Sequence, residues 1–160
     1  MKKIYLAACI VLSTLSTQAW SFQTIFIVRH GEKVDESRDP LLSAQGKNRA
    51  MNLANILRDA DVKRIYVTEF QRTQMTAAPL AEARQLSLTP YAAKESRSLA
   101  NQLSATDSNA LVVGHSNTLI DILQGLGVHT AKNVADDEYD RLIVVHLNKN
   151  AAPTYTVLRY

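Results

Sequence analysis

An apolar run that stops abruptly at charged and polar residues constrains the fold of this chain more than any other feature. Ile25–Val28 contains four apolar residues, two of them Ile and one Val. Such a short, continuous and β-branched run is typical of a strand buried in a parallel sheet. Arg29, His30 and Gly31 follow directly. Ligands of open α/β sheets bind outside the carboxyl ends of the strands, so Arg29 and His30 mark a candidate binding crevice. Gly31 lets the backbone turn there and approach a ligand closely.

The rest of the chain alternates between strand and helix patterns. Ser43 and Asn117 are expected to cap the first and the last helix, and Pro79 is expected to bend or divide the second. Strands that alternate with helices indicate an α/β protein, here a three-layer α/β/α sandwich with a largely parallel central sheet. We expect helices over 43–60, from 71 onward, over 94–103 and over 118–126, and strands at 25–28, 64–68, 86–91, 110–113, 142–147 and 155–160.

The first residues have the pattern of a secretory signal peptide. Two lysines precede a short apolar segment, Ile4–Leu15, and small residues allow cleavage after Ala19 or after Ser21. A membrane-spanning helix needs about 20 apolar residues, so no stable membrane anchor is expected. Leu6–Cys9 resembles a bacterial lipoprotein box, but a cut there leaves only about five apolar residues where roughly 7–15 are usual. We therefore expect a protein that is secreted or periplasmic after cleavage.

Residues 1–21 are thus interpreted as the signal peptide and residues 22–160 as a single domain. The apolar content of 46% is sufficient for a core. The formal charge of +3 includes two lysines of the leader, without which 16 basic residues face 15 acidic ones, a net charge of +1. That balance argues against a nucleic-acid-binding protein. Cys9, the only cysteine, lies in the leader, so the mature chain has no disulfide, thiol nucleophile or cysteine metal site. The sequence does not specify an oligomeric state.

Polar residues follow three of the expected strands. Arg29 and His30 follow the first, Glu69 and Arg72 follow the second, and His115 comes after the strand at 110–113. If these strands are parallel neighbours, their polar residues face one crevice. Two arginines, two histidines and helix N-termini together form a site for a dianion such as a phosphoryl group. A neutral imidazole in that crevice can attack phosphorus as a nucleophile.

These residues lie in three segments that resemble, in the same order, the motifs of the histidine phosphatase superfamily, its phosphoglycerate-mutase-like branch in particular. The resemblance implies that His30 becomes phosphorylated and that Arg29, Arg72 and His115 form the phosphate pocket. It makes Asn117 a weaker candidate for substrate contact. The segments are Arg29-His30-Gly31-Glu32, Thr68-Glu69-Phe70-Gln71-Arg72-Thr73-Gln74-Met75-Thr76-Ala77 and Gly114-His115-Ser116-Asn117-Thr118.

The resemblance departs from the family at the general acid. Mutase-like members carry a Glu on an insertion before the second His, and acid-phosphatase-like members carry an Asp closely after it. Here only 43 positions separate Arg72 from His115, and Ser116 follows His115. Glu69 and Glu95 are the remaining candidates, and Glu69 is preferred because it adjoins the end of the second strand. Protein phosphohistidine phosphatases resemble this small layout and work without a dedicated acid.

The sequence thus predicts a secreted, metal-independent phosphatase that passes a phosphoryl group through His30 to water and needs no cofactor. The expected partner is a small phosphorylated metabolite or an envelope sugar phosphate. Alternatives are a non-catalytic module that binds a phosphorylated ligand and a protein phosphohistidine phosphatase. A metal site at His30, His115 and a carboxylate is disfavoured because the two arginines would repel a divalent ion. Mutase activity is disfavoured by the short insertion, and the acidic segment Asp136–Asp140 is interpreted as a solvated loop.

Overall fold

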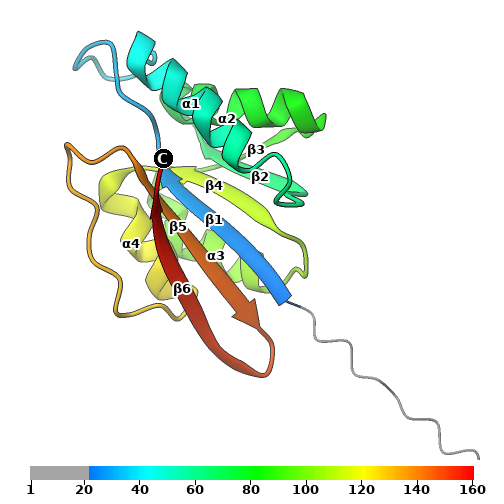
Figure 1. Ribbon diagram of the computed structural model, residues 1–160. Helices are drawn as coiled ribbons and strands as arrows, with labels where there is room; N and C mark the ends of the chain where they lie inside the picture. The colour runs from blue at the N-terminus through cyan, green and yellow to red at the C-terminus, as the bar shows by residue number, and fades with distance from the viewer. Residues whose placement is uncertain (1–21) are drawn as a thin grey trace, which may run out of the picture.

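The computed structural model describes residues 22–160, which form one six-stranded sheet flanked by helices (Figure 1). The predicted signal peptide, with Cys9 and both candidate cleavage sites, lies outside the described residues. No helix within residues 22–160 has the length and apolar character needed to cross a membrane. The strands are β1 (Phe22–Arg29), β2 (Arg64–Thr68), β3 (Leu88–Tyr91), β4 (Ala110–Gly114), β5 (Arg141–Asn148) and β6 (Ala151–Arg159). The helices are α1 (Ala44–Ile56), α2 (Gln71–Arg84), α3 (Ser96–Ser104), α4 (Ser116–Gly125) and the 3₁₀ turn η1 (Ala93–Glu95).

The strand order in the sheet is β3-β2-β4-β1-β5-β6. The pairs β2–β3, β2–β4 and β1–β4 are parallel, whereas β5 runs antiparallel to β1 and β6 antiparallel to β5. The predicted largely parallel sheet is therefore confirmed, with an antiparallel pair of strands added at one side. The predicted edge strand at the C-terminal end is also confirmed, because among the strands of residues 22–160 β6 pairs only with β5.

Helices cover both faces of the sheet, as the predicted three-layer sandwich requires. Figure 1 shows α1 beside α2, with α3 and α4 across the sheet from them. Ile25 and Ile27 of β1 pack into the core under α3 and α4, and Phe26 and Val28 pack into the core under α1 and α2. Alternate side chains of β1 thus enter opposite cores, which explains why its sequence is continuously apolar. Burial of each such side chain contributes about 1.5–3 kcal/mol.

The predicted cap of α1 is present, whereas the proline in α2 does not interrupt its helix. The Ser43 hydroxyl accepts a hydrogen bond from the Gly46 N–H at 3.1 Å, which confirms the predicted N-cap. Pro79 lies inside α2, and the helix continues through it from Gln71 to Arg84. The prediction was that Pro79 bends or divides this helix, and of these two outcomes division is wrong.

The start of α4 also differs from the prediction. The helix begins at Ser116, its N-cap is His115, and Asn117 is an exposed residue of the first turn. Thr118 closes this turn, because its hydroxyl accepts from the His115 N–H at 3.1 Å and its own N–H donates to the His115 carbonyl at 2.9 Å. Asn117 is thus not the cap, and β4 leads directly into the helix through His115.

Candidate active site

The three strands that carry the predicted site residues are neighbours in the order β2-β4-β1. Arg29 pairs with Gly114 in the parallel register, so His30 and His115 leave the sheet together. Their ring centroids are 5.3 Å apart, with the planes inclined at 63°. The expectation that the polar groups face one crevice is met for Arg29, His30, Arg72 and His115 but not for Glu69, which is not part of the lining. A cavity of about 210 Å³ at this edge is lined by Arg29, His30, Lys33, Ser37, Arg38, Pro40, Arg72, His115, Ser116 and Asn117.

His30 is buried, with 3% of its surface exposed. Its Nδ1 lies 2.8 Å from the Gly31 carbonyl oxygen. A carbonyl can only accept, so Nδ1 carries the hydrogen and Nε2 keeps a free lone pair. Burial lowers the pKa of His30 to about 3, and the positive charges of Arg29 and Arg72 act in the same direction. The imidazole is therefore neutral near pH 7 and has one nitrogen available as a nucleophile.

The turn after His30 packs tightly against two helices, α1 and α2. The Gly31 N–H donates to the Thr76 hydroxyl of α2 at 2.9 Å. A Cβ on Gly31 would lie 2.9 Å from the Gly46 carbonyl oxygen, and a Cβ on Gly46 would lie 2.3 Å from the Glu32 carbonyl oxygen. Only glycine at both positions allows this approach of α1 to the loop. The position of His30 is thus fixed by backbone contacts as well as by β1.

The Arg29 guanidinium is held from the far side of the cavity by the segment between α4 and β5. Its Nη1 donates to the Ala135 carbonyl at 3.0 Å and its Nη2 to the Tyr139 hydroxyl at 3.4 Å. Cζ also lies 4.1 Å from the centroid of the Tyr139 ring. The buried Nε of Arg29 has no hydrogen-bond partner within the described residues. The sequence favoured a solvated loop for Asp136–Asp140 and left a place at the rim of the pocket as the alternative; the contacts of Ala135 and Tyr139 with Arg29 agree with that alternative.

Arg72 emerges from the first turn of α2 and reaches the second histidine. Its Nη2 lies 3.4 Å from Nδ1 of His115, and its Nη1 lies 3.5 Å from the Arg38 carbonyl oxygen. The guanidinium also stacks on the Phe70 ring, with Cζ 4.3 Å from the centroid. The Nε of Arg72 is buried and unpartnered within the described residues, as is that of Arg29. Arg29 and Arg72 both line the cavity, and two guanidinium groups in one cavity indicate a site for an anionic ligand.

His115 is connected to a pair of threonine hydroxyls. Its Nε2 lies 3.0 Å from Oγ1 of Thr68, which lies 2.9 Å from Oγ1 of Thr73. The Thr73 hydroxyl donates to the Phe70 carbonyl at 2.8 Å, so the Thr68 hydroxyl donates to Thr73 and accepts from Nε2 of His115. In that arrangement the imidazole proton sits on Nε2, and Nδ1 accepts from Nη2 of Arg72, because a guanidinium can only donate. Burial, followed by the charge of Arg72, lowers the pKa of His115 to about 4.

The loop between β1 and α1 forms one wall of the cavity through Lys33, Ser37, Arg38 and Pro40. Asp39 anchors this loop to α2, because its Oδ1 accepts from the Gln71 N–H at 2.9 Å and lies 3.7 Å from Nη1 of Arg72. The sequence did not identify these lining residues because the segment has no periodicity. The density of charge close after the Arg-His-Gly signature was the available signal.

The candidates for a general acid lie outside the lining of the cavity. Oε2 of Glu69 accepts from the Ala93 N–H at 3.0 Å, and the residue is exposed. Its charge opposes the lowering of the pKa of His115, so it acts on the site electrostatically. Its role as proton donor stays a prediction, as does substrate contact by Asn117, which lines the cavity. The structure also brings Asp136 to the rim, where it accepts from the Ser116 hydroxyl at 2.5 Å.

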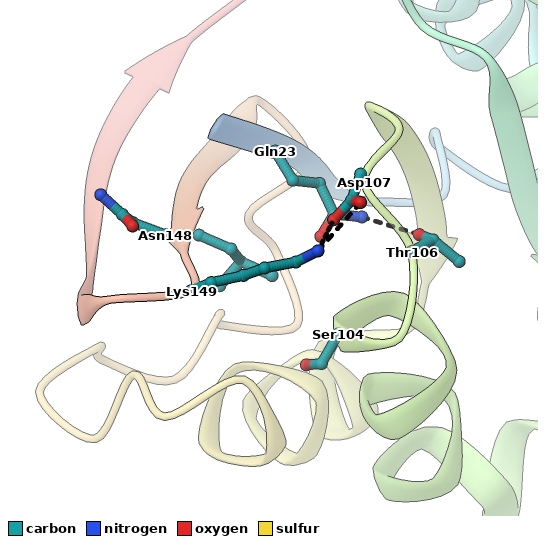
Figure 2. Close-up of a pocket in the computed structure, with 7 residues that line it drawn as sticks. Gln23, Ser104, Thr106, Asp107, Asn148 and Lys149 are labelled. Atoms are coloured by element: carbon teal, nitrogen blue, oxygen red, sulfur yellow. Dashed lines mark hydrogen bonds and ion pairs between the residues drawn. The ribbon is translucent and has the colours of Figure 1, made fainter. Parts of the chain in front are cut away.

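A second cavity, of about 160 Å³, lies at the amino end of β1 (Figure 2). The Gln23 amide group there donates to the carbonyls of Leu103 and Ser108 and to the Thr106 hydroxyl, each at 3.0 Å. Lys149 forms an ion pair with Asp107 across the same region. These contacts tie the loop before β4 to β1, which is a structural role. Within residues 22–160, no group of three or more His, Cys, Asp or Glu side chains is arranged to hold a metal ion.

Comparison with known proteins agrees with this geometry. The family model of the histidine phosphatase superfamily (branch 1) matches residues 25–93, which include His30 and Arg72. Comparison with curated protein sequences gave no match. The predicted resemblance to this superfamily is confirmed by the family match together with the fold.

Several solved structures share the fold at low sequence identity. A putative α-ribazole-5′-P phosphatase from Escherichia coli is 18% identical, with a TM-score of 0.70, over 86% of this chain and 97% of that one. A mycobacterial glucosyl-3-phosphoglycerate phosphatase is 13% identical, with a TM-score of 0.67, over 87% and 98%. The protein histidine phosphatase SixA, complexed with tungstate, is 17% identical, with a TM-score of 0.64, over 85% and 96%. All three are phosphatases by name.

Proposed function

We propose that this protein is a secreted or periplasmic, metal-independent phosphatase that hydrolyses a small phosphomonoester through a phosphohistidine on Nε2 of His30. One observation carries the proposal. A buried, neutral His30 presents an unprotonated nitrogen in a cavity that is also lined by the two arginines Arg29 and Arg72. This arrangement combines a nucleophile with donors for the oxygens of a phosphoryl group.

In the first step the Nε2 lone pair forms a bond to phosphorus while the ester P–O bond breaks. The electron pair leaves on the alcohol oxygen, which takes a proton from solvent or from a carboxylic acid at the rim. Arg29 and Arg72 donate hydrogen bonds to the phosphoryl oxygens as charge develops on them, and His115 adds a third donor once its Nδ1 carries a proton. In the second step water attacks phosphorus, the N–P bond breaks, and inorganic phosphate leaves with the hydrogens that water supplied. His30 then has its lone pair again.

Metal independence follows in this proposal from the charge of the lining. Four side chains of the cavity wall are cationic, and none of the described lining residues is a carboxylate. A divalent cation would meet repulsion there, whereas a phosphate dianion would meet attraction. Export by the N-terminal leader supports an envelope substrate, such as a small phosphorylated metabolite or a sugar phosphate.

The test is a screen of the purified protein against a panel of phosphomonoesters, with His30→Ala as control. Rapid quenching with ³²P-labelled substrate should trap a phosphoenzyme that is labile in acid and stable in base, as an N-linked phosphate is. Label on Ser116 or Thr73, or loss of turnover in a chelator, would refute the mechanism.

A protein phosphohistidine phosphatase is the second candidate, and the absence of a carboxylate from the described cavity lining favours it. Imidazole is a better leaving group than an alkoxide and depends less on a proton donor. A phosphohistidine-containing protein added to the same screen distinguishes the two functions by their relative kcat/KM.

A further inference from the structure

We infer that Arg38 forms a binding site for a second anionic group of the substrate, a carboxylate or a second phosphate, at the mouth of the cavity. The inference rests on the proposed function, because the first group is the phosphoryl group held by Arg29 and Arg72. The preferred substrate class is then a small phosphomonoester that carries a further negative charge close to the ester.

The cavity holds more positive charge than one phosphoryl group requires. Its described lining includes Arg29, Lys33, Arg38 and Arg72 and no Asp or Glu. A phosphomonoester brings two negative charges, which the two arginines at the base of the cavity balance. The two cations of the loop wall remain.

Of the two cationic residues in the loop between β1 and α1, Lys33 is paired with a carboxylate and Arg38 is not. Lys33 forms an ion pair with Glu36. The Arg38 guanidinium takes part in no ion pair and no hydrogen bond within residues 22–160, and the residue is exposed. Lone arginines on surfaces are common, so the placement of this one in the cavity wall is the informative part.

Nearby acids on the same loop are engaged elsewhere. Asp35 accepts from the Ser37 N–H at 2.8 Å, and Asp39 accepts from the Gln71 N–H at 2.9 Å. Glu36 pairs with Lys33. None of these three carboxylates therefore forms an ion pair with the Arg38 guanidinium.

The backbone of Arg38 is held in place although its charged end is free. Its carbonyl accepts from Nη1 of Arg72 at 3.5 Å, so the main chain of Arg38 adjoins one of the guanidinium groups of the phosphoryl site. The next residue, Asp39, fixes the loop to α2. A guanidinium presented in this way matches a carboxylate or phosphate by a two-point hydrogen bond.

The size of the cavity sets the distance between the two anionic groups. A volume of about 210 Å³ is smaller than the roughly 300–1,000 Å³ of pockets for drug-sized ligands. The second group must therefore lie within a few bonds of the phosphoester. Short phosphorylated hydroxy acids and short bisphosphates meet this condition.

The experiment compares kcat/KM for three matched substrates: phosphoglycolate, ethylene glycol bisphosphate and 2-hydroxyethyl phosphate. They share a primary phosphoester and differ in carrying a carboxylate, a phosphate or a neutral hydroxymethyl group. The wild-type protein should prefer at least one charged substrate over the neutral one by roughly tenfold. Whichever of the two is preferred identifies the second group.

Arg38→Gln should bring this preference close to one, and Arg38→Lys should keep part of it. Arg58→Gln is the matched control, because Arg58 is exposed, lies outside the cavity and should leave the preference at its wild-type value. Rising ionic strength should weaken the preference in the wild type. Circular dichroism verifies that each variant is folded.

A wild-type protein that hydrolyses all three compounds with equal kcat/KM overturns the inference and leaves the phosphatase proposal intact. An equal preference in the wild type and in Arg38→Gln also overturns it. If no compound is hydrolysed, not even p-nitrophenyl phosphate, the phosphatase proposal fails instead. Binding of the same three compounds, measured by calorimetry, then tests the role of Arg38. The inference requires that the wild-type protein binds a charged compound more tightly than the neutral one.

Discussion

The hydroxyl of Thr68 lies 3.0 Å from Nε2 of His115, at the buried end of a chain that continues to the Thr73 hydroxyl 2.9 Å away. Thr68 accepts the Nε2 proton of His115 and thereby favours the tautomer in which Nδ1 keeps its lone pair. That lone pair accepts from Nη2 of Arg72, so the threonine hydroxyl also orients the guanidinium that faces the cavity. The segment from Thr68 to Ala77 thus acts on the cavity in two ways, through its own Arg72 and through the contact of Thr68 with His115.

Replacement of Thr68 by Val keeps the shape of the side chain and removes the hydroxyl. We expect kcat/KM to fall about tenfold or more, because the imidazole loses both its partner and its preferred tautomer. Thr68→Ser should recover most of the activity. Steady-state kinetics with p-nitrophenyl phosphate measure the change, and the ¹⁵N shifts of the His115 ring report the tautomer. Unchanged shifts in Thr68→Val would contradict this role.

Arg72→Ala should lower kcat by roughly 10² to 10³, the usual loss for one donor to a developing oxyanion. Arg72→Lys should recover only part of this, since an ammonium keeps the charge but loses the planar fork. Arg58→Ala, which removes an exposed arginine remote from the cavity, is the control and should leave kcat unaltered. A loss of less than tenfold in Arg72→Ala would remove Arg72 from the phosphate site.

The buried histidines predict how stability depends on pH. The pKa of His30 is lowered to about 3 and that of His115 to about 4, against about 6.5 in the unfolded chain. Between these values the unfolded state binds protons that the folded state does not. Stability should therefore be highest above pH 6.5 and fall as the pH is lowered toward 4.

Urea unfolding at pH 7 and pH 4.5 measures this loss. His30→Gln should show a smaller difference between the two pH values than the wild type. His146→Gln is the matched control, since His146 is exposed on β5 and should keep the wild-type difference. A wild-type free energy of unfolding that does not change over this range would show that the histidines are not buried in their neutral form.

The dependence of the rate on the pKa of the leaving group tests whether the protein supplies a proton donor. Because no carboxylate is part of the described cavity lining, we expect the rate to fall steeply as the pKa of the leaving group rises. If Glu69 is the acid, the dependence should be shallow in the wild type and steep in Glu69→Gln, with a loss of about 10² to 10⁴ on alkyl phosphates. Asp136→Asn applies the same test to the carboxylate that contacts Ser116. A shallow dependence in all three proteins would require a donor elsewhere.

Gly46→Ala should destabilise the protein although alanine normally favours a helix by about 1 kcal/mol. The new Cβ would lie 2.3 Å from the Glu32 carbonyl oxygen and 2.8 Å from its nitrogen, so the backbone must move. We expect a loss of about 1–3 kcal/mol or more in the free energy of unfolding. Asn48→Ala, at an exposed site of the same helix, should be neutral or slightly stabilising. Chemical denaturation of both variants measures the difference.

The sequence predicted those features of the fold that depend on the local pattern of apolar and polar residues, such as the bounds of a buried strand. The run Arg64–Thr68 forms β2 with the expected bounds, because the β-branched and aromatic residues Ile65–Val67 at its centre are buried in the sheet. The direction of β5 was not predictable in this way, since a buried strand has the same composition whether its neighbour is parallel or antiparallel. Asn117 had the chemistry of a cap, but the Thr118 hydroxyl already pairs with the His115 N–H.

The sequence identified those site residues that directly follow the end of a strand. Arg29, His30 and His115 do, and the structure brings them together. Arg38 and Tyr139 come from irregular segments that only the tertiary fold places at the cavity. No periodicity in the sequence could locate them.

The strand order β2-β4-β1 has a consequence for how the protein acquires its ability to bind anions. β4 lies between β1, which leads into His30, and β2, which leads into the helix that carries Arg72, yet it comes after both strands in the chain. During synthesis or refolding the two halves of the pocket stay apart until β4 is inserted between them. Such non-local pairing is slow compared with helix formation. Capture of a phosphate analogue such as vanadate should therefore appear with the last phase of refolding, after most of the helical signal has returned, and so report completion of the sheet.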